Sequence, residues 1–262
     1  MSTAAFDAVR AIPKRTGEIR RLIASAKGVE SNDEDLYNSI CRASSILMAA
    51  QLEGFIKDIY RAISDDFNFN IYDFSKRPAA MQNEFCRQIA YFDGVPESEV
   101  NSRVNSLKKF FAANTVSMEF GAFPYKETPN KNPGADTVDA KFKRIGVPDV
   151  VASIAGSFFE EIFKNDSRAT YKVLRECARG RAGLYRFPYR KMPPSYGFTY
   201  KVGVKSSPWR DYLESIMKRR HSIAHGDTFD NPTTWEELSR DVDKLDAFMH
   251  ALAYSCCGFY FE

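Results

Sequence analysis

The chain has 262 residues, of which 44% are hydrophobic and 27% are charged, a composition typical of a soluble globular protein with a sizeable core. No apolar run approaches the roughly 20 residues of a membrane helix, and the first residues lack the apolar segment of a signal peptide, so we expect a cytoplasmic protein without membrane contacts. The five cysteines contain no CxxC pair, which favours reduced, buried thiols.

A first helix is predicted over about residues 6–26, and Pro13 and Gly17 are the positions at which it could be interrupted. After the polar segment "SNDEDLYNSI", a long buried helix is predicted over residues 36–63, because its apolar residues recur at helical spacing without a proline. Those apolar residues are Ile40, Leu47, Leu52, Phe55, Ile56, Ile59 and Ile63.

The middle of the chain is predicted to contain four further helices, over about residues 79–91, 97–113, 136–145 and 148–164. The loop "GAFPYKETPNKNPGAD" separates the second of these helices from the third. The later segment "YGFTYKVGV" alternates apolar and polar residues, which is the pattern of one arm of a short β-hairpin.

Two more helices are predicted at the end of the chain. The first starts at "SSPW", with a serine cap and Pro208 in its first turn, and leads directly into "RRHSIAHGD", where Gly226 suits a helix end. The second opens at "DNPTTWEEL" with a threonine cap. The chain is therefore predicted to be an all-α single domain over residues 1–262, with core helices at about 6–66 and 206–258. The region at about 67–205 is predicted to be a long insertion of helices and loops that includes the one short β-hairpin.

Two of the three histidines of the chain lie in "RRHSIAHGD". This segment resembles the R-x4-6-H motif of HEPN-domain proteins, with Arg220, four intervening residues and then His225. The polar residue that follows the arginine in that family, commonly asparagine, is His221 here. The helix "RASSILMAAQLEGFIKDIYRAI" also resembles the helix that packs beside the motif, so the resemblance covers roughly residues 36–66 and 209–254.

The resemblance implies a HEPN-like helical bundle that pairs as a homodimer. Many members of the family are metal-independent endoribonucleases of toxin–antitoxin, antiviral and RNA-processing systems, and others only bind RNA or nucleotides. Both functions stay open for this chain, together with an antitoxin or another defence-system protein as a partner. In some two-gene systems the toxin has a tyrosine two residues past the histidine, which its partner modifies with nucleotides. Asp227 stands there in this chain, which argues against regulation of that type.

The chemistry of RNA cleavage explains why an arginine and a histidine would be placed together. RNA supplies its own nucleophile, the 2′-OH, and cleavage to a 2′,3′-cyclic phosphate needs a base, an acid and a cation for the phosphate. Imidazole titrates near neutrality, and guanidinium offers paired donors to phosphate oxygens. On a continuous helix Arg220 and His225 would lie about 140° apart, so we expect the helix to end between them, near Gly226 and Asp227. Two paired chains would supply both an acid and a base.

Each residue of the motif also has a structural interpretation. His225 could cap a helix or pack in the core, and Arg220 could form a surface ion pair. His221 and His225 match an HxxxH metal pair, but Asp227 is the only carboxylate nearby, so no metal or other cofactor is expected. We favour His221 as a group that supports the site or contacts phosphate, and Arg219 as a source of general positive potential.

Glu53 interrupts the apolar stretch "ILMAAQLEGFI", so it is predicted to point into the bundle or its interface and to orient the motif arginine or histidine. The alternative is a charge on the exposed side of its helix.

Residues 168–205 contain ten basic residues and one acid, a net charge of +9 in a chain whose total is +3, interleaved with seven tyrosines and phenylalanines. Cations hold phosphates and aromatic rings stack on unpaired bases, so this segment is a candidate RNA-binding region. Its densest part, "RGRAGLYRFPYRKMPP", is predicted to be a loop. The RNA-binding candidates within it are Arg181, Arg186, Arg190 and Lys191. The alternative is a solvated basic face whose aromatic rings pack in the core.

Overall fold

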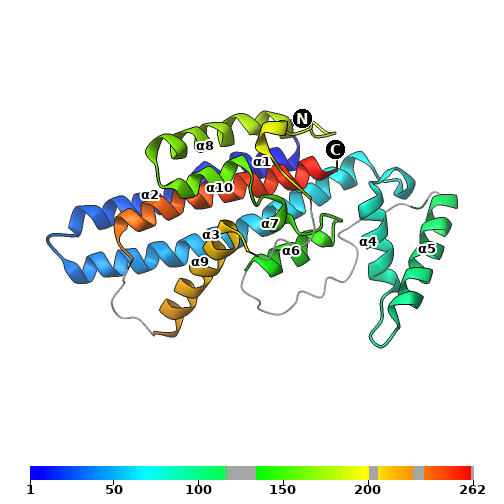
Figure 1. The fold of residues 1–262 in the computed structure, drawn as a ribbon, viewed down its shortest axis with the longest axis horizontal. Coiled ribbons are helices and arrows are strands. Elements are labelled where there is room, and N and C mark those ends of the chain that lie inside the picture. Colours follow the sequence, from blue (N-terminus) through cyan, green and yellow to red (C-terminus); the bar gives the residue numbers. More distant parts are fainter. Residues whose placement is uncertain (115, 117–133, 201–205, 227–232, 261–262) are drawn as a thin grey trace.

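The computed structural model describes residues 1–114, 116, 134–200, 206–226 and 233–260. Over these residues the protein is an all-α bundle, and none of them belongs to an extended strand. The helices of the long bundle are α1 (Ala4–Arg10), α2 (Ile12–Val29), α3 (Glu34–Asn70) and α10 (Trp235–Phe259). In Figure 1, α2, α3 and α10 run side by side along the longest axis of the molecule.

The first predicted helix is interrupted where its proline stands. Helix α1 ends at Arg10, and α2 begins at Ile12 with Pro13 in its first turn, where the missing amide hydrogen costs no intrahelical hydrogen bond. Gly17 lies inside α2 and does not interrupt it. Helix α3 is longer than the apolar pattern predicts, because Asp33 caps it at one end and it continues to Asn70 at the other.

Helix α10 lies at the centre of the bundle. Its first turn is closed by a capping box, in which Thr234 accepts from the backbone N–H of Glu237 and the Glu237 side chain accepts from the backbone N–H of Thr234. Every residue from Leu245 to Gly258 is buried, so this helix is covered on all sides by its neighbours. These neighbours include α1, α2 and α3 and some elements of the middle region.

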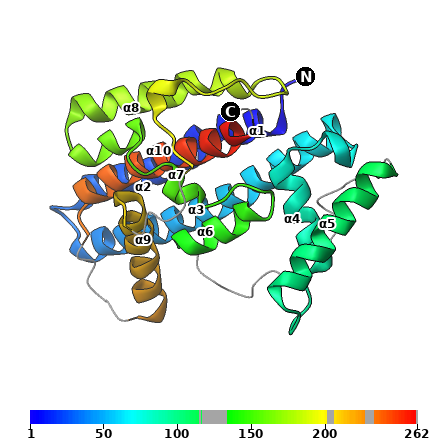
Figure 2. The ribbon, with the colours of Figure 1, turned by 45° about the vertical axis from the view of Figure 1, so that its right-hand side comes forward.

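The middle region contains helices α4 (Ala79–Ala90), α5 (Glu97–Ala113), α6 (Ala135–Lys143), α7 (Val150–Ser153) and α8 (Ser167–Gly180). Four 3₁₀ helices are described as well: η1 (Phe74–Lys76), η3 (Phe158–Lys164), η4 (Arg181–Leu184) and η5 (Pro194–Tyr196). Helices α4 and α5 form a hairpin that extends from one end of the bundle, whereas α8 lies along its side (Figures 1 and 2).

The structure differs from the predictions for this region in three ways. The single helix predicted over residues 148–164 is divided into α7 and η3, because Gly156 adopts a left-handed conformation with φ +71° between them. Helix α8 was not predicted. Residues 196–200 of the predicted β-hairpin contain the end of η5 and no strand, and residues 201–204 lie outside the described part, as does most of the loop at 121–136.

Helix α9 (Pro208–His225) crosses the bundle and points away from it. Ser207 caps it, as predicted for one of the two serines, and Pro208 occupies its first turn. Trp209 packs between Phe163 and Phe248, with ring centroids 4.7 and 5.6 Å away. The first half of α9 is therefore fixed in the core, while its last turns extend outward (Figures 1 and 2).

Among the described helices, none combines the length and the apolar character that crossing a lipid bilayer requires.

A buried ion pair fixes α9 to α6. The carboxylate of Asp139 accepts from the backbone N–H of Val151 at 2.7 Å and binds the Arg210 guanidinium at 2.9 Å. Burial raises the pKa of Asp139 to about 6, although the Val151 amide and Arg210 oppose this rise. In the folded protein the pKa of Asp139 lies above its usual value of 3.8, so protonation of this carboxyl stabilises the fold. The stabilisation is fully present below about pH 4 and is lost as the pH rises through 6.

We therefore expect Asp139→Asn to change the pH dependence of folding. The free energy of unfolding of the wild type, relative to this variant, should fall between pH 4 and pH 7 by up to ~3 kcal/mol, the free energy of a pKa rise from 3.8 to about 6. Urea unfolding at several pH values measures the difference. Parallel pH profiles for the two proteins would contradict the expectation.

Candidate active site

The motif residues lie in the last two turns of α9, which continues through His225. Gly226 closes the helix in a left-handed conformation, with φ +73°, and its N–H donates to the carbonyl of Ile223. The prediction that the helix ends between Arg220 and His225 is therefore wrong, because the left-handed residue comes after the histidine and not before it. Within one chain the two side chains leave the helix about 140° apart.

The continuous helix instead brings the two histidines together. His221 and His225 are one turn apart, and their ring centroids are separated by 4.1 Å. Both are exposed, and neither imidazole forms a hydrogen bond or an ion pair with the described part of the chain. The exposed Lys218 lies on the same side, three residues before His221. Arg220 is half-buried. The candidate site is thus an exposed helix end with two imidazoles and adjacent cations.

Arg219 has a structural partner. Its guanidinium forms an ion pair with Asp241 at the start of α10, where the Asp241 carboxylate also binds the Lys244 ammonium at 3.1 Å. The hydroxyl of Tyr212 donates to the Asp241 carbonyl at 2.6 Å, so α9 and α10 are joined at this point. Arg219 therefore positions the motif helix, and its charge is largely compensated.

The other supporting residues are not brought to the motif by the described structure. Glu53 binds the Lys57 ammonium at 2.8 Å, one turn further along α3, and its side chain is 37% exposed. The alternative of a charge on the exposed side of the helix therefore describes Glu53, and the predicted pairing with the motif is not found among the described residues. Asp227 lies outside the described residues.

The part of the basic segment that forms α8 and the residues directly after it lies on the opposite side of the bundle from the end of α9. Both views place α8 and the residues after it along one side and the last turn of α9 on the other (Figures 1 and 2). Proximity in sequence to the motif helix therefore does not become proximity in space within one chain. Arg186, Arg190 and Lys191 are exposed, as an RNA-binding surface requires.

The aromatic rings of this segment divide between surface and core. Tyr189 is buried, and its hydroxyl donates at 2.7 Å to Asp66, whose carboxylate also accepts from the first backbone amides of α1. Tyr196 is buried against Phe159. Tyr171 and Tyr185 are 67% and 45% exposed and remain available to a ligand. The segment therefore combines a basic surface with rings that serve the core.

Helix α8 adds cations that sequence reasoning did not assign to a helix. Its buried side consists of the small residues Ala169, Val173, Cys177 and Gly180, which give a weak apolar signal between many charges. The spacing of four, four and three residues was nevertheless present in the sequence and could have predicted the helix. The exposed cations of α8 are Arg168, Lys172, Arg175 and Arg179.

Arg181 is not part of an open loop but of a buried polar network. Its Nε–H donates to Nε2 of His250 at 3.2 Å, so that nitrogen must be unprotonated and the ring proton lies on Nδ1. Nδ1 in turn contacts the backbone carbonyl of Asp246 at 2.9 Å and the Asp246 carboxylate at 3.1 Å. The imidazole of His250 is fully buried and uses both nitrogens.

Asp246 connects this network to α2. Its carboxylate accepts from the Thr16 hydroxyl at 3.0 Å and lies 3.5 Å from the Arg20 guanidinium. Burial opposes ionisation of Asp246, but the His250 hydrogen bond, Arg20 and Thr16 together lower its pKa below the usual value. The carboxylate is therefore ionised in the core and compensated there.

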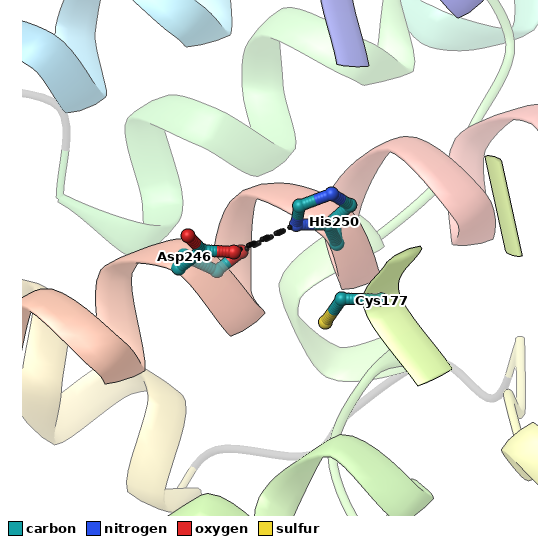
Figure 3. Close-up of side chains that lie close together, drawn as sticks. All are labelled: Cys177, Asp246 and His250. Atoms are coloured by element: carbon teal, nitrogen blue, oxygen red, sulfur yellow. Dashed lines mark hydrogen bonds and ion pairs between the residues drawn. The ribbon is translucent and has the colours of Figure 1, made fainter. Parts of the chain in front are cut away.

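Cys177 completes a group with the composition of a metal site. Figure 3 shows Cys177, Asp246 and His250 facing one another, and their possible ligand atoms lie within 4.8 Å of one another. Two arginines already contact the group, and both nitrogens of His250 are engaged by protein atoms. Burial raises the pKa of the Cys177 thiol well above its usual value, which disfavours the thiolate that a metal requires. The described geometry therefore supports a structural network.

The described residues form an all-α bundle that presents an R-x4-H motif at the end of a helix anchored in the interior. The family model described as RiboL-PSP-HEPN matches residues 10–258, and the chain belongs to this family. HEPN domains are generally RNase-type or RNA-related modules, which places the protein in that broad class. The comparisons with curated proteins and with solved structures give no match.

Because Arg181 is bonded to a buried imidazole, we expect its removal to affect folding. Arg181→Ala leaves Nε2 of His250 without its donor, and an unsatisfied buried acceptor costs about 1–3 kcal/mol. The exposed Arg186→Ala is the matched control and should change the free energy of unfolding by less than about 0.5 kcal/mol. Chemical denaturation compares the two, and equal stabilities would show that the contact with His250 is unimportant.

Proposed function

We propose that the protein is a metal-independent endoribonuclease that acts at the end of α9, in a toxin or antiviral defence role. The observation that carries this proposal is the exposure of two neighbouring imidazoles, next to the half-buried Arg220, on the last turns of an anchored helix. Side chains that serve only the fold are normally buried or paired, whereas these imidazoles have no hydrogen-bonding partner within the described chain. The defence role rests on the resemblance of the motif alone.

The proposed reaction uses the RNA's own 2′-OH as nucleophile. His225 accepts or donates a proton: a base removes the 2′-OH proton, the oxygen attacks phosphorus, and the bond to the 5′ oxygen breaks as an acid protonates it. The products carry a 2′,3′-cyclic phosphate and a free 5′-OH. Arg220 compensates the charge of the phosphate with its paired donors, and His221 supports the site or contacts phosphate.

A second copy of the chain would complete this arrangement. Arg220 and His225 leave a continuous helix about 140° apart, so a single chain does not direct both toward one phosphate. In a homodimer paired at the ends of α9, the arginine of one chain and the histidine of its partner can face the same phosphate. The same pairing places two histidines in one cleft, where one acts as base and the other as acid.

RNA is proposed to bind through the exposed cations that follow α8. Arg186, Arg190 and Lys191 are exposed and carry three positive charges close together in sequence. In a dimer paired at the ends of α9, both motifs lie on the side of the bundle away from this surface, so an RNA that contacts both would pass around the bundle (Figure 2).

The alternative function is a non-catalytic RNA- or nucleotide-binding module that acts as a scaffold or regulator in a defence complex. One observation favours it specifically: the arginine and the histidine of the motif do not converge within one chain. A protein that only binds RNA does not need them to converge.

We expect His225→Ala to abolish RNA cleavage while the free energy of unfolding changes by no more than about 0.5 kcal/mol, because the side chain is exposed. The assay incubates purified full-length chain with mixed RNAs in EDTA and analyses the product ends. A substrate with a 2′-deoxy residue at the cut site should resist cleavage, because it lacks the nucleophile. Cleavage that survives the substitution, or that requires a divalent metal, contradicts the proposed mechanism.

Mixing two inactive variants tests the shared site. Arg220→Ala retains His225, and His225→Ala retains Arg220, so a heterodimer of the two contains one complete arginine–histidine pair across its interface. Partial return of cleavage on mixing supports the dimer. If native mass spectrometry shows that mixed dimers form and cleavage does not return, one arginine–histidine pair shared across the interface is not sufficient for cleavage.

The basic segment can be tested without disturbing the buried network. A variant in which Arg186, Arg190 and Lys191 are all replaced by alanine should bind RNA more weakly. The slope of log affinity against log salt concentration should become less steep by about 0.7–0.9 for each RNA phosphate that the variant no longer neutralises. Filter binding at several salt concentrations measures both effects, with Arg181 left intact so that His250 keeps its donor.

A charge-matched control separates a local effect from a general one. Replacing the exposed cations Lys76, Lys109 and Lys143 removes the same charge from other parts of the surface. If both triple variants lose RNA affinity equally, binding depends on net charge and the segment after α8 is not the binding site.

A further inference from the structure

The last turns of α9 place two imidazoles on one side of a helix. Residues four apart on a continuous helix are neighbours, and the rings of His221 and His225 have centroids 4.1 Å apart. Both side chains are exposed, and no described protein group engages their nitrogens. The lone pair of a neutral imidazole is a strong ligand for transition-metal ions.

The separation of the rings suits one small ion. Zinc binds imidazole nitrogen at about 2.0–2.1 Å, so two nitrogens at a tetrahedral angle lie roughly 3.3 Å apart, a spacing that rings 4.1 Å apart can reach. A base and an acid on opposite sides of one phosphorus are separated by two hydrogen bonds of about 2.8 Å each, a span of more than ~5.6 Å. The two rings of one chain are therefore better spaced for a shared ion than for two sides of a phosphate.

The buried group around His250 shows the opposite situation. There the donors Arg181 and Arg20 occupy the positions next to the imidazole and the carboxylate, and the site lies in the core. At the end of α9 the two imidazoles face solvent, so water can fill the remaining coordination positions.

We propose that His221 and His225 together bind a divalent transition-metal ion of the zinc class, and that the bound ion inhibits the ribonuclease. The second part rests on the proposed function, because an ion on the lone pair of His225 prevents that nitrogen from accepting a proton. The ion takes no part in cleavage, and no redox change is involved. Metal availability would then set the fraction of active protein.

Calorimetric titration of the full chain with zinc chloride tests binding independently of any activity. The wild type should bind one ion per chain, or one per two chains if paired motifs share it. His221→Ala and His225→Ala should each weaken binding by at least about tenfold, a loss that removing groups around a metal commonly causes. Thermal melts confirm that each variant is folded.

Two controls decide where the ion binds. Lys218→Ala keeps both imidazoles and removes only a repelling charge on the same side, so it should bind zinc no more weakly than the wild type. Cys177→Ser removes a potential ligand from the buried group and should also leave the affinity unchanged. Zinc affinity that is equal in the wild type and both histidine variants, or that is lost in Cys177→Ser, overturns the proposed site.

Inhibition is tested separately by adding zinc to the RNA cleavage assay. Cleavage should fall over the zinc concentrations at which the calorimetric site fills, and EDTA should restore it. If zinc binds as expected and cleavage is unaffected, the inhibitory role is overturned while the metal site stands. If no RNA is cleaved under any condition, the proposed ribonuclease fails, and the titration alone still decides whether the site exists.

Discussion

The ionised carboxylate of Asp246 is held inside the bundle by groups from several elements. Thr16 and Arg20 reach it from α2, and His250 contacts it one turn further along α10 and receives Arg181 from the segment after α8. A buried charge without such partners would cost several kcal/mol. The network therefore joins α10 to α2 and η4, and the rest of the bundle packs around α10.

A consequence for function is the rigid attachment of α9. Trp209 packs in the core, Arg210 binds α6 through Asp139, and Arg219 binds α10 through Asp241. These contacts run from the first turn of the helix to Arg219 and leave its end outside the bundle. His221 and His225 are thus fixed in direction by a well-packed helix without being covered by it, which is how a reactive side chain can be both ordered and accessible.

Local signals in the sequence predicted much of this fold. The periodicity of α3 and α10, the caps of α9 and α10 and the effect of Pro13 depend on neighbouring residues, so they could be predicted without tertiary information. The role of Arg181 depends on a residue 69 positions away, and a count of charges assigned it to a surface instead. The end of α9 was predicted wrongly because Gly226 indicates a nearby helix end without fixing the last helical residue. Since the helix continues through His225, this side chain lies beside His221 and not beside Arg220.

The central position of α10 also affects how the protein can be made. The ribosome completes α2 and α3 long before α10, so the faces that they turn toward α10 have no partner while more than 160 residues are still being added. Asp246 itself belongs to α10, so its buried network cannot form until α10 emerges. The motif in α9 is likewise synthesised before Asp241 of α10, the ion-pair partner of Arg219. Nascent chains therefore cannot complete the bundle, and the end of α9 would be held in place only after the messenger RNA has been read almost to the end of the described region.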